Sequence, residues 1–457
     1  MRDLESGHFA APLSIHTSSG VPEALEAFVD ALEPHLPSTW RSPEPDGGLQ
    51  DWCVSLQLEG ASAVWAGVDM LLQVSVLSSR DRHRKKVAVG DQSYHGPPST
   101  SLGGRSPLWD KAYQVKYPVP TAGQPCDEDK LLDEFDVFLR KHGNDVGVIL
   151  IEPQWGSSQT ALPWPETLLK EYIKRIKVCG IKVLCDEIMC GLGRHGKGTL
   201  FLSDAWDLDP DCVTFGKSIA GGVFPLSGAV IKSGRDVLGV HGRSVMQSHT
   251  FAGSSARSLM MGVEVLKELP LWFPSISKLG EELSLIFKYL ESMSRGMIKV
   301  QGQGLMWGCL FTFDGIHRDD FVRAQTVASF KRNCEGLGVL PYFVPVGGFM
   351  VTPVIDVDVG TIYEIGQRLE AALKRTIVER VWKDSKDTAI DQICSTTFVE
   401  KLNGGFIELA NVEAMKSSSS DPILSDSICS PQLHVTRSCT SCSSFVCLNL
   451  RTRFLQI

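Results

Sequence analysis

Three segments decide the fold: VGVILIEPQWG at 146–156, IKVLCDEIMCGLGRHGK at 181–197 and PDCVTFGKSIAGG at 210–222. The first two begin as short, nearly unbroken runs of Val, Ile and Leu, which are typical of buried strands in a parallel sheet rather than of helices. Each run ends in acidic residues, Glu152 in one and Asp186 and Glu187 in the other. Open α/β sheets bind their ligands at the carboxyl ends of the strands, so we expect these carboxylates to face a site.

Lys217 lies in the third segment, shortly before the turn residues Gly221 and Gly222. Taken singly, a strand-end Asp is more often a helix cap or a turn residue, and a Lys before two glycines is usually solvated. An Asp and a Lys on neighbouring strands that face one crevice indicate a catalytic pair rather than a cap and a solvated side chain. They form a pair suited to covalent chemistry on a carbonyl group.

Composition describes an ordinary globular protein and excludes several classes. The 457 residues are 43% hydrophobic and 21% charged, which suits a large domain with a smaller one. The net charge of −8 argues against a nucleic-acid partner, and no apolar run is long enough for a membrane span. The N-terminus lacks an apolar secretory region, so the 13 cysteines are expected to be reduced thiols. We therefore expect a cytoplasmic location, with an organellar one left open.

The order of the motifs resembles the class III pyridoxal-phosphate-dependent aminotransferases. In that family E-P-x-x-G, D-E-V-Q-x-G-x-G-R-x-G-K, T-x-G-K-x-x-x-G-G and H-T-F-x-G follow one another. The corresponding segments here are Glu152–Gly156, Asp186–Lys197, Thr214–Gly222 and His249–Gly253. The resemblance implies that the cofactor is pyridoxal 5'-phosphate, that Lys217 is catalytic through a Schiff base with it, and that Asp186 keeps its ring nitrogen protonated.

The resemblance also implies a set of cofactor-binding residues: Gly60, Ala61, Ser62, Tyr94, Glu152, Asp186, Ile188, Met189, Lys217 and Thr250. The first three open a predicted helix ending near Leu77, whose N-terminus would hold the phosphate. Tyr94 would stack on the ring, although a core aromatic is the alternative interpretation, and Ile188 would pack on the opposite ring face. Thr250 would bind the phosphate of the partner subunit's cofactor, which implies a homodimer. No metal site is expected.

The implied reaction moves an amino group from an ω-amino acid or amine donor to a 2-oxo acid acceptor. Three departures from the family pattern bear on it. Glu59 replaces a Ser beside the phosphate, Met189 replaces a Gln, and the segment Gly347–Pro353 lacks the Arg that often holds the substrate carboxylate. Two alternatives therefore stay open: an aminomutase, decarboxylase or racemase with the same cofactor, or a non-catalytic relative of the fold.

The predicted architecture is an α/β fold with a mostly parallel central sheet and helices on both faces, the fold type I large domain, plus a smaller α+β C-terminal domain. We expect a partly disordered N-terminal segment at 1–49, the cofactor-binding large domain at 50–290, the small domain at 291–380 and a disordered tail at 381–457. Helices are expected at 129–141, 165–179 and 359–374, a solvated basic run at 80–86 and a surface excursion at 97–125. Cys439 and Cys442 lack a second regular pair, so we interpret them as tail rather than zinc ligands.

Overall fold

A computed structural model of the chain describes residues 23–41, 52–77, 81, 83–96, 113–232, 255–314, 320–344, 347–387 and 455–456. The described residues as far as Thr376, together with Leu455 and Gln456, belong to one compact unit; those of the last helix from Ile377 belong to a second. The domain boundaries expected from the sequence stay predictions. None of the helices in these ranges is long and apolar enough to cross a membrane.

The central sheet has seven strands in the order β1-β7-β6-β5-β4-β2-β3. They are β1 (Trp52–Gln57), β2 (Lys86–Gly90), β3 (Gln114–Tyr117), β4 (Val146–Ile151), β5 (Lys182–Asp186), β6 (Cys212–Phe215) and β7 (Ser227–Lys232). The five from β6 to β3 are parallel, and β7 and β1 close one edge in antiparallel pairing. The predicted mostly parallel sheet is confirmed.

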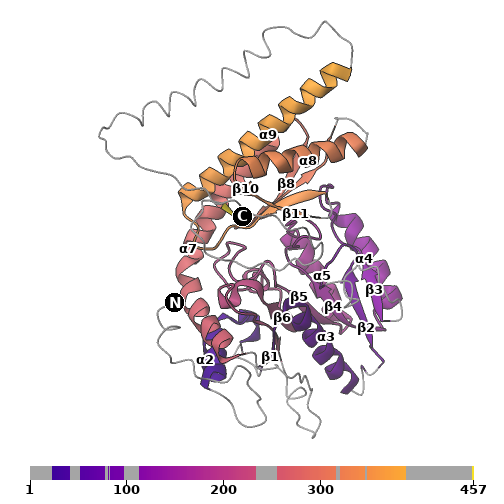
Figure 1. Cartoon of the computed structure of the whole chain (residues 1–457). Helices are drawn as coiled ribbons and strands as arrows, with labels where there is room; N and C mark the ends of the chain where they lie inside the picture. Colours follow the sequence, from indigo (N-terminus) through magenta and orange to yellow (C-terminus); the bar gives the residue numbers. More distant parts are fainter. Residues whose placement is uncertain are drawn as a thin grey trace, which may run out of the picture. The chain divides into compact units, whose positions relative to one another are not determined.

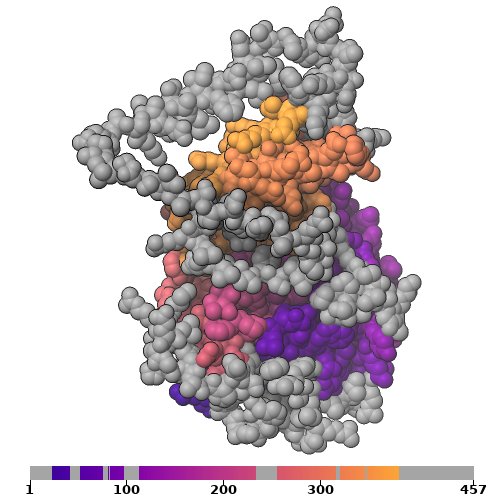
Figure 2. Space-filling view, in the orientation of Figure 1, coloured from indigo at the N-terminus to yellow at the C-terminus, as the bar shows by residue number. Residues whose placement is uncertain are grey.

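Helices cover both faces of this sheet (Figure 1). On one face lies α3 (Gly60–Leu77); the other face carries α2 (Glu23–Leu32), α4 (Glu128–His142), α5 (Glu166–Val178) and α7 (Ala256–Met293). Each face of the sheet has its own hydrophobic core. Alternate residues of β4 enter these two cores, Val148 on the α3 side and Ile149 on the other side. A strand buried on both faces must be apolar at every position, which explains the unbroken run in its sequence. Residues of α3, dark violet in Figure 2, reach the molecular surface.

Within the described ranges, four short helical elements lie between the longer ones: two follow α2, one lies between β5 and β6, and one between β6 and β7. They are η2 (Glu33–His35), η3 (Ser38–Trp40), α6 (Leu202–Ala205) and η5 (Lys217–Ala220). Of these, η5 follows β6 directly and begins with Lys217, so the position of this lysine is fixed by the end of the sheet.

A second, antiparallel sheet has the order β11-β12-β9-β8. Its strands are β8 (Ile298–Gln303), β9 (Met306–Phe311), β11 (Tyr342–Val344) and β12 (Gly348–Val351), and a separate pair joins β10 (Val339–Leu340) to β13 (Leu455–Gln456). The accompanying helices are α8 (Asp320–Gly336) and α9 (Val359–Asp387). Stacked aromatic rings pack two helices against this sheet. The ring centroids of Phe330 on α8 and Phe349 are 5.1 Å apart, and those of Phe287 on α7 and Trp307 are 5.7 Å apart. The predicted α+β part is thus confirmed.

Three local features differ from the sequence expectations. The expected excursion at 97–125 contains β3, because Tyr117 is buried and its hydroxyl donates to the Leu150 carbonyl at 2.7 Å. The expected solvated basic run contains Arg84, whose guanidinium is buried and donates to the carbonyls of Val146 and Cys179 at 3.2 and 2.8 Å. The last helix, expected at 359–374, continues to Asp387.

Candidate active site

Three of the predicted residues lie at the carboxyl edge of three adjacent parallel strands. Glu152 follows β4, Asp186 ends β5, and Lys217 comes two residues after β6. The strands are neighbours in the order β4-β5-β6, so their carboxyl ends share one edge of the sheet. This is the placement that the sequence predicts, and it is where open parallel sheets bind ligands.

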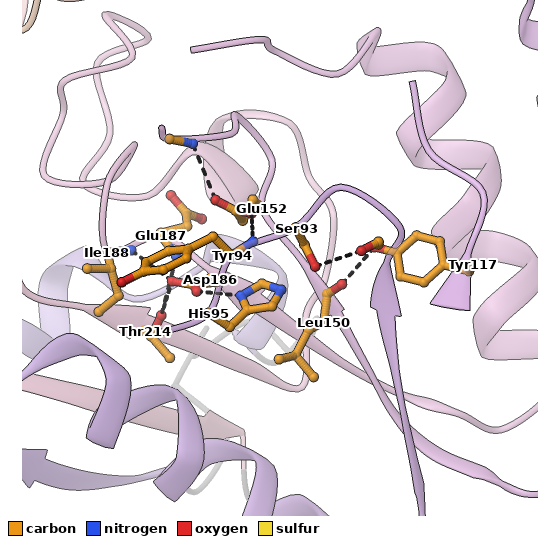
Figure 3. A network of polar contacts seen from close by, with 12 residues as sticks. Ser93, Tyr94, His95, Tyr117, Leu150, Glu152, Asp186, Glu187, Ile188 and Thr214 are labelled. Atoms are coloured by element: carbon orange, nitrogen blue, oxygen red, sulfur yellow. Dashed lines mark hydrogen bonds and ion pairs between the residues drawn. The ribbon is translucent and has the colours of Figure 1, made fainter. Parts of the chain in front are cut away.

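The Asp186 carboxylate is held by three groups (Figure 3). His95 Nδ1 lies 2.7 Å from its Oδ2, while the Thr214 hydroxyl and the Ile188 backbone N–H donate to its Oδ1 at 3.1 and 3.2 Å. Only 7% of Asp186 is exposed. A buried carboxylate with contacts to both oxygens is fixed in orientation, so Asp186 can present a defined charge to a cation at this edge.

His95 and Thr214 were assigned no role from the sequence, although His95 follows Tyr94 and Thr214 is the first residue of the motif that contains Lys217. Burial disfavours the charged imidazole of His95, but its hydrogen bond to Asp186 and the charge of that carboxylate outweigh burial, and the pKa of His95 is raised. The His95 ring is therefore more readily protonated than an ordinary histidine. The signal available in the sequence was adjacency to Tyr94, and it could not reveal which carboxylate His95 contacts.

Glu152 links the same edge to the loop after β2. Its Oε1 accepts from the Tyr94 backbone N–H at 3.2 Å, and its Oε2 accepts from the Gly156 N–H at 3.3 Å (Figure 3). Burial raises the pKa of Glu152 to about 7, against the opposing effect of nearby His95. The backbone of Tyr94 is thereby tied down while its side chain remains 51% exposed. The aromatic ring is consequently available for contact with a ligand.

Ile188 packs between two glycines from different segments. A Cβ placed on Gly60 would lie 2.9 Å from Ile188 Cγ2, and one on Gly216 would lie 3.0 Å from Ile188 Cδ1. A Cβ on Gly156 would lie 3.2 Å from Met189 Cγ. The absence of side chains at these glycines lets α3, the end of β5 and the end of β6 approach closely. The structure thus brings Gly60, Ile188 and Met189 together with Lys217, which follows Gly216.

The backbone and charge of Lys217 are both unusual. Its φ is +49°, a left-handed backbone conformation that residues other than glycine rarely adopt and that recurs at functional sites. Lys217 is exposed to solvent at the sheet edge. Partial desolvation by the neighbouring protein nevertheless lowers the pKa of the amine, while the charges of Asp186 and Glu152 oppose the shift. A neutral amine is therefore more available at Lys217 than at an ordinary lysine.

The predicted phosphate residues open helix α3. The first backbone hydrogen bond of this helix runs from the Ala63 N–H to the Glu59 carbonyl at 3.1 Å. The N–H groups of Gly60, Ala61 and Ser62 precede it and belong to the first turn, which lacks acceptors inside a helix. The Ser62 hydroxyl donates to Glu59 Oε1 at 3.2 Å. The acidic side chain that departs from the family pattern is thus engaged by the first turn itself.

The structure does not test two of the sequence predictions. Thr250 and the expected tail cysteines, Cys439 and Cys442, lie outside the described residues. Within the described ranges, no group of His, Cys, Asp and Glu side chains is placed to hold a metal ion. The remaining predicted site residues are placed on α3, the β2 loop and the ends of β4, β5 and β6.

Comparison with known proteins points to one family. An alanine/serine racemase from Pyrococcus horikoshii is 26% identical over 55% of this chain and 55% of its own length, and an ornithine aminotransferase from Bacillus cereus is 34% identical over 36% of this chain and 40% of its own. The chain thus spans about half or less of the curated relatives it matches. The structure of an omega-transferase from Vibrio fluvialis superimposes with a TM-score of 0.68 at 17% identity, covering 82% of this chain and 89% of that one, which shows the fold alone. The model of the aminotransferase class-III family matches residues 46–340, the region that carries both the sheet and the Asp186–Lys217 edge, so this chain belongs to the class III aminotransferases.

Proposed function

We propose that the chain is a pyridoxal-phosphate-dependent aminotransferase that moves an amino group from an ω-amino acid or amine to a 2-oxo acid. The observation that carries this proposal is the pairing of Asp186, held by three groups, with Lys217 at the end of the neighbouring strand. Family membership supports the same reaction class.

The residues at the sheet edge fit the chemical groups of the cofactor. Its protonated ring nitrogen requires an anion, which Asp186 supplies. Its aldehyde requires an amine, which Lys217 supplies. Its phosphate requires N–H donors at a positive helix end, which the first turn of α3 offers from Gly60 onwards. When bound, the cofactor accepts the electrons of the bond cleaved at the substrate's amino carbon.

The protein's own groups then orient the reactants and move one proton. His95, Thr214 and the Ile188 N–H keep the Asp186 carboxylate aimed at one position. The lowered pKa of Lys217 would let its Nζ act as the base that takes the proton from the amino carbon of the substrate. Tyr94, with its exposed ring, is proposed to cover one face of the cofactor.

The choice of donor is supported by the apolar surroundings of Met350. This residue stands in the segment without the carboxylate-binding Arg, is 1% exposed and packs in a cluster with Cys190 and Met306, against which Met189 also packs. The nearby cation Arg194 donates to the Pro353 carbonyl at 2.7 Å. These contacts suit a donor whose reacting carbon carries no carboxylate, as in an ω-amino acid or a primary amine.

Subunit organisation and location remain parts of the proposal. We infer a homodimer in which Thr250 of each chain reaches the cofactor of the other, and the motif at 249–253 supports this inference. Light scattering of the purified chain measures the mass, and a monomer that still transfers amino groups would contradict it. A cytoplasmic location rests on the sequence alone, and fractionation of the source cells tests it.

The reaction is tested with a panel of donors and two acceptors, pyruvate and 2-oxoglutarate. We expect a new amino acid to form only when a donor and an acceptor are both present, and ω-amino acids or primary amines to react faster than α-amino acids. Lys217→Ala should abolish turnover. Products that form equally well without an acceptor would contradict amino transfer.

Racemisation is the second candidate, and it is favoured by the relative from Pyrococcus horikoshii, an alanine/serine racemase. It would use the same Asp186 and Lys217, with the proton returned to the same carbon of the amino acid. Incubation of L-alanine or L-serine without any 2-oxo acid, followed by chiral chromatography, separates the two reactions. Accumulation of the D-enantiomer would replace the aminotransferase proposal.

A further inference from the structure

Ser227, the first residue of β7, carries a buried hydroxyl that has no role in the reaction proposed above. It is 1% exposed, and its Oγ has no hydrogen-bond partner among the residues that the structure describes. An unpaired buried hydroxyl is unfavourable, and such groups usually have a ligand or an ordered water as partner. The position of Ser227 in the sheet indicates which of these it is.

The side chain of Ser227 lies on the face of the sheet covered by α3. Ala229 and Ile231, two and four residues further along β7, pack with Val64 and Val68 of α3, and alternate residues of a strand share a face. Because β7 runs antiparallel to β6, its first residue lies at the edge where β6 ends. Ser227 therefore lies at the carboxyl edge on the α3 side.

Contacts through two glycines connect this hydroxyl-bearing residue to the first turn of α3. A Cβ placed on Gly216 would lie 3.3 Å from Ser227 Cβ and 3.0 Å from Ile188 Cδ1. A Cβ placed on Gly60 would lie 2.9 Å from Ile188 Cγ2. Ser227, Gly216, Ile188 and Gly60 thus form a continuous set of neighbours, with the helix N-terminus at one end and the buried hydroxyl at the other.

A second polar side chain accompanies the hydroxyl. Gln57 pairs with Ser227 across β1 and β7, is 4% exposed, and uses one Nε2 hydrogen to donate to Ser55 Oγ at 3.0 Å. An amide nitrogen carries two hydrogens, so Gln57 has another donor. Glu59, the acid that precedes this helix, is exposed and accepts from Ser62. Donors at the positive end of a helix are the groups that bind a phosphate monoester.

We propose that the Ser227 hydroxyl donates a hydrogen bond to the cofactor's phosphate, completing the phosphate site formed by the first turn of α3. This inference rests on the proposed function, because it requires pyridoxal 5'-phosphate as the cofactor. It adds a residue of β7 to the residues that the family motifs mark.

The test compares three ligands on cofactor-free full-length protein: pyridoxal 5'-phosphate, pyridoxal without phosphate, and inorganic phosphate as a competitor. Ser227→Ala should weaken pyridoxal-phosphate binding about tenfold to a hundredfold, as expected for the loss of one hydrogen bond to a charged group. It should leave pyridoxal binding unchanged and weaken competition by phosphate. The cofactor-free variant should unfold at the same temperature as the wild type or higher, because an unpaired hydroxyl is removed. Absorbance titration and thermal unfolding provide the two readouts.

Ser75→Ala is the matched control, since Ser75 is also buried but donates to the Leu71 carbonyl at 3.2 Å within α3. It should bind both pyridoxal ligands like the wild type. Equal weakening of pyridoxal and pyridoxal phosphate by Ser227→Ala, or no weakening of either, overturns the inference and assigns the hydroxyl to packing or to a water. Wild-type protein that binds neither ligand overturns the proposed function as well.

Discussion

Replacing Gly216 with Ala tests whether Ile188 fills the space between the segments that meet at the site. Gly216 has a φ of −179°, an extended conformation open to any residue, so the substitution adds no backbone strain. The new Cβ would lie 3.0 Å from Ile188 Cδ1 and 3.3 Å from Ser227 Cβ. Overpacking of this kind costs about 1–3 kcal/mol. We expect Gly216→Ala to lower the free energy of unfolding of the cofactor-free protein by that amount.

Ile188→Val removes the Cδ1 atom that makes the closest contact. Alone it should cost about 0.5 kcal/mol, the low end for deletion of one methylene, because Ile188 is only partly buried. In the double variant the nearest contact of the new Cβ becomes Ser227 Cβ at 3.3 Å. The double variant should therefore be less destabilised than the sum of the two single variants, by at least about 0.5 kcal/mol.

Urea unfolding followed by tryptophan fluorescence measures all four proteins of this cycle. Gly336→Ala is the matched control, because no atom lies within 4 Å of the position its Cβ would occupy. It should not reduce stability. Strict additivity of the two substitutions, or a neutral Gly216→Ala, would refute the packing of Ile188 between these segments.

Three further substitutions have definite expected outcomes. Cofactor-free Lys217→Gly should be more stable than Lys217→Ala by about 1 kcal/mol in thermal unfolding, because glycine adopts the φ of +49° freely; equal stabilities would argue against backbone strain. Burial raises the pKa of Glu152 from 4.5 to about 7, so the folded state binds more protons in that window and stability falls as pH rises, by up to about 1.4 kcal/mol per pH unit. Glu152→Gln should flatten this slope in urea titrations between pH 4.5 and 7, and an unchanged slope would contradict the assignment. His95→Phe removes the partner of Asp186 Oδ2 and should weaken cofactor binding about tenfold in absorbance titrations; unchanged affinity would show that Asp186 needs no support from His95.

The central strands and their carboxylates could be predicted because local sequence determines them. A strand buried on both faces must be apolar throughout, and the charged residue after it marks the sheet edge, as with Val146–Ile151 and Glu152. Lys217 could be predicted for the same reason, since β6 and η5 are contiguous in the chain. These features depend on neighbours in sequence.

Pairings between distant segments could not be predicted. The contact of His95 with Asp186 spans 91 positions, and that of Arg84 with the Cys179 carbonyl spans 95. Arg84 lies in a run of basic residues that is usually solvated, and its burial depends on the carbonyl groups around it and on its ion pair with Asp81 at 3.1 Å. The strand β3 could not be predicted either. It lies in a segment rich in prolines and glycines, and its burial depends on contacts of Tyr117 with other parts of the fold.

The proposed active site depends most directly on a covalent bond between Lys217 and the cofactor beside Asp186. Borohydride reduction of the protein loaded with pyridoxal 5'-phosphate, followed by proteolysis and mass spectrometry, locates that bond. We predict that the reduced cofactor is found on the peptide containing Lys217 and is absent from Lys217→Ala. Label on a different lysine, or bound cofactor that borohydride cannot attach to any lysine, would contradict the proposed active site.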